Sequence, residues 1–156
     1  MVDGNDATAE LMTEYVTVTI GDHMFGLPIF RVQDVFVPDR LTRVPLAPPE
    51  VAGILNLRGR VVTAIDMRSR LDLGARPAGA PVMAIGIETK GESYGLLVDA
   101  VGEVMALRNN ACEPKPANLD PRLSRVAAGI YRLENQLMVV LDVDRVLDIN
   151  GGAMAA

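Results

Sequence analysis

Apolar and polar residues alternate over several short stretches of this chain. Apolar side chains alternate with threonines over 15–20, and apolar residues alternate again over 25–29 and 83–87. A period of two residues is typical of a strand with one buried face. Lys90-Gly91-Glu92 forms a turn that leads into a further apolar segment at 94–98. The pattern predicts an all-β domain of many short strands, in keeping with its ten prolines and fourteen glycines.

Helical patterns are scarce, and the two best candidates are single turns that follow Asp66 and Asp142. Each aspartate comes directly after a predicted strand, where its side chain can cap the first turn of a helix. Asp142-Val143-Asp144 also has the D-x-D form that can hold a divalent cation, because carboxylates are hard ligands. The sequence favours the caps, since the same arrangement follows both predicted strands.

The most informative feature of the sequence is an internal repeat. FGLPIFRVQDV at 25–35 resembles YGLLVDAVGEV at 94–104, and GILNLRGRVVTAIDMRSRL at 53–71 resembles GIYRLENQLMVVLDVDRVL at 129–147. Two matches in the same order and at comparable spacing indicate two similar β-units in tandem. Each unit supplies about five strands. Since neither unit is large enough to bury its own sheet, we expect the two to share one hydrophobic core.

The size and composition of the chain limit its function classes. Its 156 residues and 16.7 kDa fit one domain, which we place at 13–149 between tails at 1–12 and 150–156. A net charge of −5 and a pI near 4.8 argue against binding to nucleic acid or to an anionic membrane surface. The single cysteine cannot form an internal disulfide, which fits a reducing cytoplasm. The N-terminus lacks the features of a signal peptide, and no apolar run is long enough to span a membrane.

No set of residues in the sequence forms a recognisable catalytic or cofactor site. His23 is the only histidine and lies in a polar turn, so a Ser-His-Asp or Cys-His arrangement is not indicated. Cys112 is interpreted as a small side chain at the edge of a loop. No phosphate-binding glycine motif occurs, and the proline-rich segment 45–49 is interpreted as a rigid connector rather than a polyproline ligand. We therefore expect no enzyme activity, no metal and no cofactor.

Arg58-Gly59-Arg60 interrupts an apolar stretch and has two interpretations. A hairpin turn with solvated arginines accounts fully for Gly59. Alternatively, Arg58 stands at the rim of the sheet, free to meet a partner, because the planar guanidinium pairs with carboxylates through two hydrogen bonds and is enriched at interface hot spots. An interaction module is the expected class. The alternative is a small-ligand-binding β-barrel or a minor enzyme, which would need a polar cluster inside a pocket.

These residues resemble a known family. The pattern F-G-L-P-I-x-x-V-Q-D-V, a proline-rich loop and then G-I-L-N-L-R-G-R-V-V-x-x-I-D-M-R is similar to the CheW family of bacterial chemotaxis coupling proteins, over about 15–149. The resemblance implies two intertwined five-stranded β-barrels that share one hydrophobic core, with one or two short helices. It also implies a non-catalytic adaptor, without a cofactor, that joins chemoreceptors to the CheA histidine kinase in chemotaxis signal transduction. The chain begins at Met1 and has no room for a kinase or receiver domain, so we expect a free-standing cytoplasmic member recruited to membrane-associated receptor arrays.

The resemblance implies a receptor-binding groove between the two subdomains. Four residues match positions that the family uses there: Val32, Asp34, Gly53 and Arg58. The family usually has glutamate at the position of Asp34, so the carboxylate here reaches one methylene less far. Arg58 becomes the expected recognition residue of the GILNLRGRVV stretch.

The resemblance also implies a surface for the kinase. Gly95 and Leu96 are candidate members of an apolar contact with CheA. Glu113 and Asn118 lie where relatives make lateral kinase contacts through a basic and an aromatic residue, so this chain departs from the family in charge and in size there. Other CheW-like domains in ring assemblies are further candidate partners.

Overall fold

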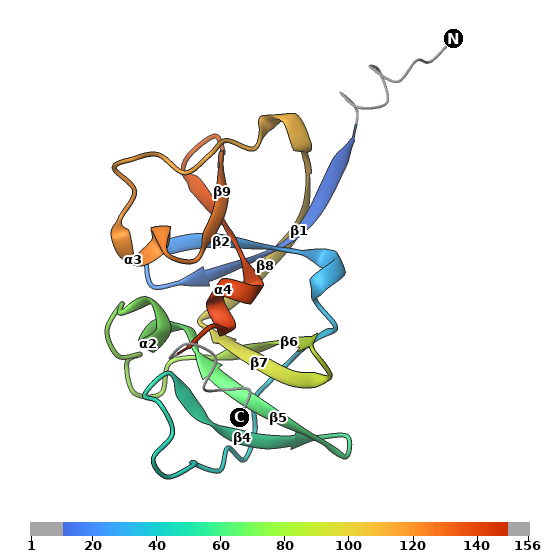
Figure 1. Ribbon diagram of the computed structural model, residues 1–156, viewed down its shortest axis with the longest axis vertical. Helices are drawn as coiled ribbons and strands as arrows, with labels where there is room; N and C mark the ends of the chain where they lie inside the picture. Colours follow the sequence, from blue (N-terminus) through green and yellow to red (C-terminus); the bar gives the residue numbers. More distant parts are fainter. Residues whose placement is uncertain (1–10, 150–156) are drawn as a thin grey trace.

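The structure is a computed structural model that describes residues 11–149 of the chain (Figure 1). The tails predicted at 1–12 and 150–156 lie outside this range except for residues 11 and 12, and the first strand begins at Met12. The strands are β1 (Met12–Ile20), β2 (His23–Pro28), β3 (Asp34–Phe36), β4 (Val51–Leu57), β5 (Arg60–Asp66), β6 (Met83–Thr89), β7 (Glu92–Val98), β8 (Ala100–Arg108), β9 (Ala127–Arg132) and β10 (Leu137–Leu141). The helices are α2 (Met67–Leu71), α3 (Pro121–Ser124) and α4 (Val143–Leu147), with 3-10 turns η1 (Ile29–Arg31) and η2 (Asn109–Ala111).

Helices α2 and α4 begin where the sequence predicted single helical turns. Asp66 accepts a hydrogen bond from the backbone N–H of Arg68 at 3.0 Å, and Asp142 accepts one from that of Arg145 at 3.2 Å. Both aspartates therefore cap a helix, as predicted. Among residues 11–149, no group of three or more His, Cys, Asp or Glu side chains could hold a metal ion. None of the helices in that range has the length and apolar character needed to cross a membrane.

The strands form two five-stranded sheets. Sheet A has the order β8-β1-β2-β10-β9, and sheet B has the order β3-β6-β7-β5-β4. Figure 1 shows sheet A above sheet B along the long axis of the molecule, with α4 between them. The predicted all-β class with a few short helices is confirmed.

The two halves of the chain exchange a hairpin. Strands β1 and β2 leave the first half and pair with strands of the second half in sheet A, while β6 and β7 pair with strands of the first half in sheet B. Four strand pairings join the halves: β1–β8 and β3–β6 are antiparallel, and β2–β10 and β5–β7 are parallel. In the two parallel pairings, Phe25 lies opposite Val139 and Tyr94 lies opposite Thr63. Phe25 and Tyr94 are equivalent in the sequence repeat, and so are Val139 and Thr63. The repeat of the sequence is thus preserved in the register of the sheets.

Each sheet has two edge strands. In both sheets, the segment that follows one edge strand forms an isolated β-bridge with the other edge strand. Thr42, in the segment that follows β3, exchanges two 2.8 Å hydrogen bonds with Ile54 of β4. Glu113, in the segment that follows β8, exchanges bonds of 2.8 and 2.9 Å with Ile130 of β9. The strand ladders themselves leave both sheets open. The structure therefore confirms two five-stranded sheets without closing either of them into a barrel by strand pairing.

A glycine lies beside each isolated bridge. A Cβ atom at Gly53 would stand 2.5 Å from the carbonyl oxygen of Thr42, and one at Gly129 would stand 2.9 Å from that of Glu113. Real Cβ atoms do not approach backbone that closely, so the crossing segment needs a residue without a side chain on the strand beneath it. These two glycines are also equivalent in the sequence repeat.

Both sheets contribute to one hydrophobic core, as predicted. Its fully buried members include Ile20, Phe25 and Leu27 of sheet A and Ile65, Ile85 and Leu96 of sheet B, together with Met67, Leu71 and Val146 of the short helices. Burying a large aliphatic or aromatic side chain contributes about 1.5–3 kcal/mol. Because these side chains come from both sheets, separating the sheets would expose most of the core at once.

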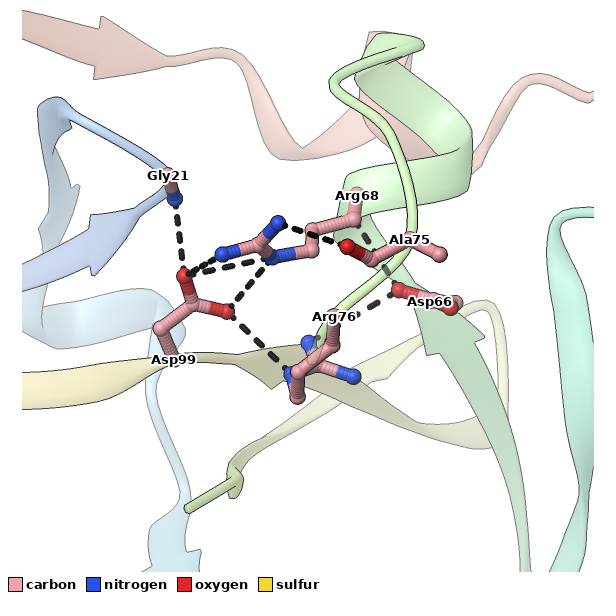
Figure 2. Close-up of polar contacts among 6 residues, drawn as sticks. All are labelled: Gly21, Asp66, Arg68, Ala75, Arg76 and Asp99. Atoms are coloured by element: carbon pink, nitrogen blue, oxygen red, sulfur yellow. Dashed lines mark hydrogen bonds and ion pairs between the residues drawn. The ribbon is translucent and has the colours of Figure 1, made fainter. Parts of the chain in front are cut away.

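An ion-pair cluster at Asp99 ties the same regions together (Figure 2). Asp99, between β7 and β8, accepts a 2.7 Å hydrogen bond from Arg68 of α2 and a 3.2 Å bond from Arg76 of the following loop. It also accepts a 2.8 Å bond from the backbone N–H of Gly21, in the turn between β1 and β2. One carboxylate thus links the exchanged β1–β2 hairpin of sheet A to α2, which follows the last strand of the first half.

The surroundings of Asp99 set its protonation. Burial alone would raise the pKa of this carboxyl, but the hydrogen bonds from Arg68 and from the Gly21 amide outweigh burial, so the pKa lies below its usual value. The side chains of Asp99 and Arg68 are only 19% and 15% exposed. The carboxylate therefore stays ionised in a largely enclosed position, where its partners are needed.

We expect the two sheets to unfold in a single cooperative transition, because they share strands and one core. Differential scanning calorimetry of the full chain should give a calorimetric enthalpy equal to the van't Hoff enthalpy. Two resolved thermal transitions, or a stable soluble fragment that ends near Gly79, would show instead that the halves are independent.

Removing the charge of Asp99 should destabilise the fold in a pH-dependent way. We expect Asp99→Asn to lower the free energy of unfolding by about 2 kcal/mol at neutral pH, since two guanidinium groups lose their partner. Because the pKa of Asp99 is lower in the folded chain than in the unfolded chain, its stabilisation is present above the unfolded pKa and is lost as the pH falls through the folded value. Urea unfolding over a pH series should show the difference narrow below about pH 4. A difference that stays constant with pH would contradict this account of the cluster.

Candidate functional site

The Arg58-Gly59 pair forms the tip of a tight β-hairpin. Leu57 and Arg60 lie opposite each other at the ends of β4 and β5, so the connecting loop has two residues. Both have positive φ, 52° at Arg58 and 85° at Gly59, as a type I′ turn requires. Asn56 accepts a 2.9 Å hydrogen bond from the backbone N–H of Gly59. The hairpin interpretation is confirmed, and arginine stands where Asn, Asp or Gly is usual.

The side chain of Arg58 extends from this turn towards β3. Its Nη1 atom lies 3.3 Å from Oδ2 of Asp34, and the two side chains are 74% and 23% exposed. An ion pair of that length with one exposed partner contributes little to stability. The structure thus brings two of the sequence-predicted site residues together and leaves the guanidinium accessible from solvent.

A network of polar side chains lies next to this pair. Arg60 approaches Oε1 of Gln33 at 3.4 Å and the hydroxyl of Ser93 at 3.5 Å, and Gln33 donates a 2.7 Å hydrogen bond to Glu88. A hollow of about 420 Å³ lies beside this network and is lined by Arg60, Val61, Thr63, Glu88, Gly91, Glu92 and Ser93. A second hollow of about 620 Å³ lies on the other flank of the hairpin, lined by Asp39, Arg40, Thr42, Ile54, Leu55, Asn56 and Val61. The β4–β5 hairpin therefore contributes residues to two hollows.

Exposed apolar side chains occur in the segments that carry Asp34 and Arg58, and sequence reasoning missed them. Phe30 is 77% exposed, Val37 65%, Val61 63% and Val35 42%. In β3, Asp34 and Phe36 turn inward, so Val35 takes the outer face. The signal was present in the sequence, because Val35-Phe36-Val37 leaves no polar residue for an outer face. These side chains are the apolar area that the segments around the pair expose to solvent.

Val32 and Gly53 take structural positions near this surface. Val32 follows η1 and is half-buried against the core. Gly53 leaves space for the carbonyl of Thr42, so the absence of a side chain at this position is needed by the fold. Their expected role in receptor binding stays a prediction.

Gly95 and Leu96 cannot form a contact surface in this conformation. They lie in β7, the central strand of sheet B, and Leu96 is 0% exposed. Leu96 belongs to the main core, and its neighbour Leu97 is buried on the other face. The prediction of a kinase contact at these two residues is corrected, because both faces of the strand are covered.

Glu113 and Asn118 lie at sheet A, away from the hairpin tip. Glu113 accepts bonds of 3.0 and 3.1 Å from Nε of Arg132, and the two side chains are 43% and 60% exposed. Asn118 lines a hollow of about 270 Å³ that has apolar walls, together with His23, Met24, Pro116, Leu119, Asp120, Leu123, Leu137 and Val139. Both predicted residues are thus available to a partner, and their kinase role stays a prediction.

Comparison with known proteins matches most of the chain to one family. A family model described as CheW-like domain matches residues 14–150. The chain is 28% identical over 133 residues to a chemotaxis protein CheW of Rhizobium meliloti, which covers 85% of this chain and 86% of the relative. It is 27% identical over 143 residues to a chemotaxis protein CheW of Bacillus subtilis, which covers 90% and 92% of the two chains. The crystal structure of the scaffolding protein TtCheW from Thermoanaerobacter tengcongensis matches with a TM-score of 0.79 and 30% identity, over 90% of this chain and 96% of the other.

Replacing Arg58 by the residue that the turn prefers should leave the fold intact. We expect Arg58→Asn to keep the free energy of unfolding unchanged within about 0.5 kcal/mol, since Asn adopts positive φ more readily and the ion pair is weak. Lys90→Asn is the matched control, because Lys90 and Gly91 form a two-residue turn with φ of 52° and 77°. Urea denaturation measures both variants. A loss above about 1 kcal/mol for Arg58→Asn alone would mean that the guanidinium holds the sheet together.

Proposed function

This chain belongs to the CheW family, and we propose from this premise that it is a non-catalytic scaffold that couples chemoreceptors to a CheA histidine kinase in chemotaxis signalling. The observation that carries the proposal is the match over nearly the whole chain to CheW proteins and to a solved scaffolding protein of the same fold. The role of a scaffold is to bind, and the chemistry required of it is surface complementarity rather than a reactive group.

We propose that the surface around Asp34 and Arg58 binds the cytoplasmic tip of a chemoreceptor. The exposed guanidinium supplies a planar donor for a carboxylate of the partner, and its weak intramolecular pair with Asp34 is readily exchanged for an intermolecular one. Phe30 and Val35 supply apolar area that a partner can cover. A charged anchor beside apolar side chains is the usual composition of an interface hot spot.

We propose that the kinase, and other CheW-like domains in ring assemblies, contact the surface of sheet A that contains Glu113 and Asn118. The hollow beside Asn118 has apolar walls that include Leu137, which is 38% exposed. The Glu113–Arg132 pair at this surface can exchange its intramolecular contacts for contacts with charged groups of a partner. Two separate surfaces would allow one chain to hold receptor and kinase at the same time.

The family also supports two finer points of the proposal. The isolated bridges at Thr42 and Glu113 favour a barrel-like closure of each sheet, in keeping with the intertwined barrels expected from the resemblance. We place the protein in the cytoplasm, recruited to membrane-associated arrays by its partners, since a receptor tip and a histidine kinase meet there.

Reversing the charge of Arg58 should weaken receptor binding selectively. We expect Arg58→Glu to reduce affinity for a chemoreceptor cytoplasmic tip by about 2 kcal/mol or more, because a donor to carboxylates becomes a repelling anion. Asp34→Ala should weaken the same interaction. Arg60→Glu is the matched control and should have a smaller effect, since Arg60 is directed towards Gln33 and Ser93. Isothermal titration calorimetry with the purified tip measures all three variants.

Binding to purified CheA should remain saturable and unchanged in Arg58→Glu, because the proposed kinase surface lies on the other sheet. A thermal melt of the same variant should agree with wild type within about 0.5 kcal/mol in stability. A large drop in melting temperature with unchanged receptor affinity would show that Arg58 serves the fold and not recognition.

A further inference from the structure

A row of four very small residues continues from Asp34 across sheet B. Asp34 of β3 is paired in register with Gly86, and the row runs on through Gly95, Ala64 and Gly53, one residue from each strand. Directly paired residues of neighbouring strands share a face of the sheet, so this face of the row carries no side chain larger than a methyl group apart from the carboxylate of Asp34.

Gly86 is the residue that the Asp34 carboxylate lies against. A Cβ atom at Gly86 would overlap Oδ1 of Asp34, and it would stand 3.4 Å from both Cγ and the carbonyl oxygen of that residue. The backbone of Gly86 does not have positive φ, so an L-residue could adopt its conformation. The need for glycine at this position therefore comes from the carboxylate above it and not from the backbone of β6.

The position of the Asp34 carboxylate is energetically unfavourable for one of its two oxygens. Oδ1 of Asp34 is buried and has no hydrogen-bond partner among residues 11–149, which is unfavourable for a charged group. Strand β3 has three residues, and its neighbour Gln33 is held to β6 by a 2.8 Å hydrogen bond from its backbone N–H to the carbonyl of Gly86. The strand thus holds Asp34 close to β6, and only a glycine there leaves room for the carboxylate. The other oxygen, Oδ2, then lies 3.3 Å from Arg58.

We propose that Gly86 is a positioning residue for recognition. It fixes the place of the Asp34 carboxylate, and the carboxylate in turn orients the Arg58 side chain that a partner meets. This inference rests on the proposed receptor-binding role of the Asp34–Arg58 pair. Gly86 itself touches no partner. A methyl group at this position would push the carboxylate outward, away from its place beside Arg58, while adding nothing to the outer surface of the sheet.

The test compares two variants that each add one methyl group to the row. Gly86→Ala should weaken affinity for the chemoreceptor tip about tenfold, whereas Gly95→Ala should change it less than about twofold. At Gly95 the new methyl would meet Phe36 and Val62 at 3.4 Å and would not reach Asp34, and the buried position of Gly95 keeps it out of any interface. Equal effects of the two variants would overturn the proposal.

A double-mutant cycle separates positioning from simple loss of stability. In an Asp34→Ala background, Gly86→Ala should cause no further loss of receptor affinity, and the double variant should melt at or above the temperature of Gly86→Ala alone, because the obstructed carboxylate is gone. If Gly86→Ala fails to fold, the double variant should restore folding. A double variant that is as weak or as unstable as the sum of its parts would contradict the role given to Gly86.

A readout without receptor distinguishes failure of this inference from failure of the proposed function. The carboxyl ¹³C signal of Asp34 and the Nε–H signal of Arg58 should both shift in Gly86→Ala and stay in place in Gly95→Ala. If these signals behave so while Asp34→Ala and Arg58→Glu leave receptor affinity unchanged, the proposed receptor surface is wrong and Gly86 still positions the pair, but not for this partner, which overturns the recognition role. If the signals do not shift, the positioning itself is overturned.

Discussion

Two parallel strand contacts, β2 with β10 and β5 with β7, are the constraint on which the rest of the structure depends. Each contact joins a strand of one half of the chain to a strand of the other, so neither half has a complete sheet without its counterpart. The shared core follows from this exchange, because the inner faces of both sheets must then lie against each other. Parallel pairing needs a long connection, and the segments between these strands supply it.

The exchange also explains where the charged cluster lies. The chain leaves sheet B at the end of β7 and enters sheet A at β8, and Asp99 is the residue at that passage. A carboxylate at this place can be reached at once from the β1–β2 turn and from α2. The hairpin tip with Arg58 lies at the far end of β4 and β5, so its side chain is spared from holding the sheets together. Arg68 and Arg76 therefore hold the two sheets together, while Arg58 of the same half is left for the proposed recognition role.

The sequence predicted the elements of this fold better than their partners. Alternation identified β1, β2 and β6, and the repeat identified the two equivalent units down to residues such as Phe25 and Tyr94, which later prove equivalent in register. The exchange of hairpins was not readable from the residues alone, because a repeat has the same sequence whether its units lie side by side or interleave. The misplacement of Leu96 has a similar origin. Leu96-Leu97-Val98 shows no alternation, and such a run belongs to a strand covered on both faces, which composition alone did not distinguish from a contact surface. Gly86 was missed because its role depends on a cross-strand neighbour far away in sequence.

The pairing of β2 with β10 limits how early this fold can be completed while the chain is being synthesised on the ribosome. Sheet B has all its strands once the chain has been made as far as Val98, so it can assemble while synthesis continues. Sheet A is different, because Met24 of its central strand pairs with Met138, and β10 is among the last segments to emerge. The β1–β2 hairpin, made first, can pair with β8 through β1, but the other edge of β2 must wait for β10. The free edge of β2 therefore stays unpaired for most of synthesis, although the hairpin that carries it belongs to the oldest part of the nascent chain.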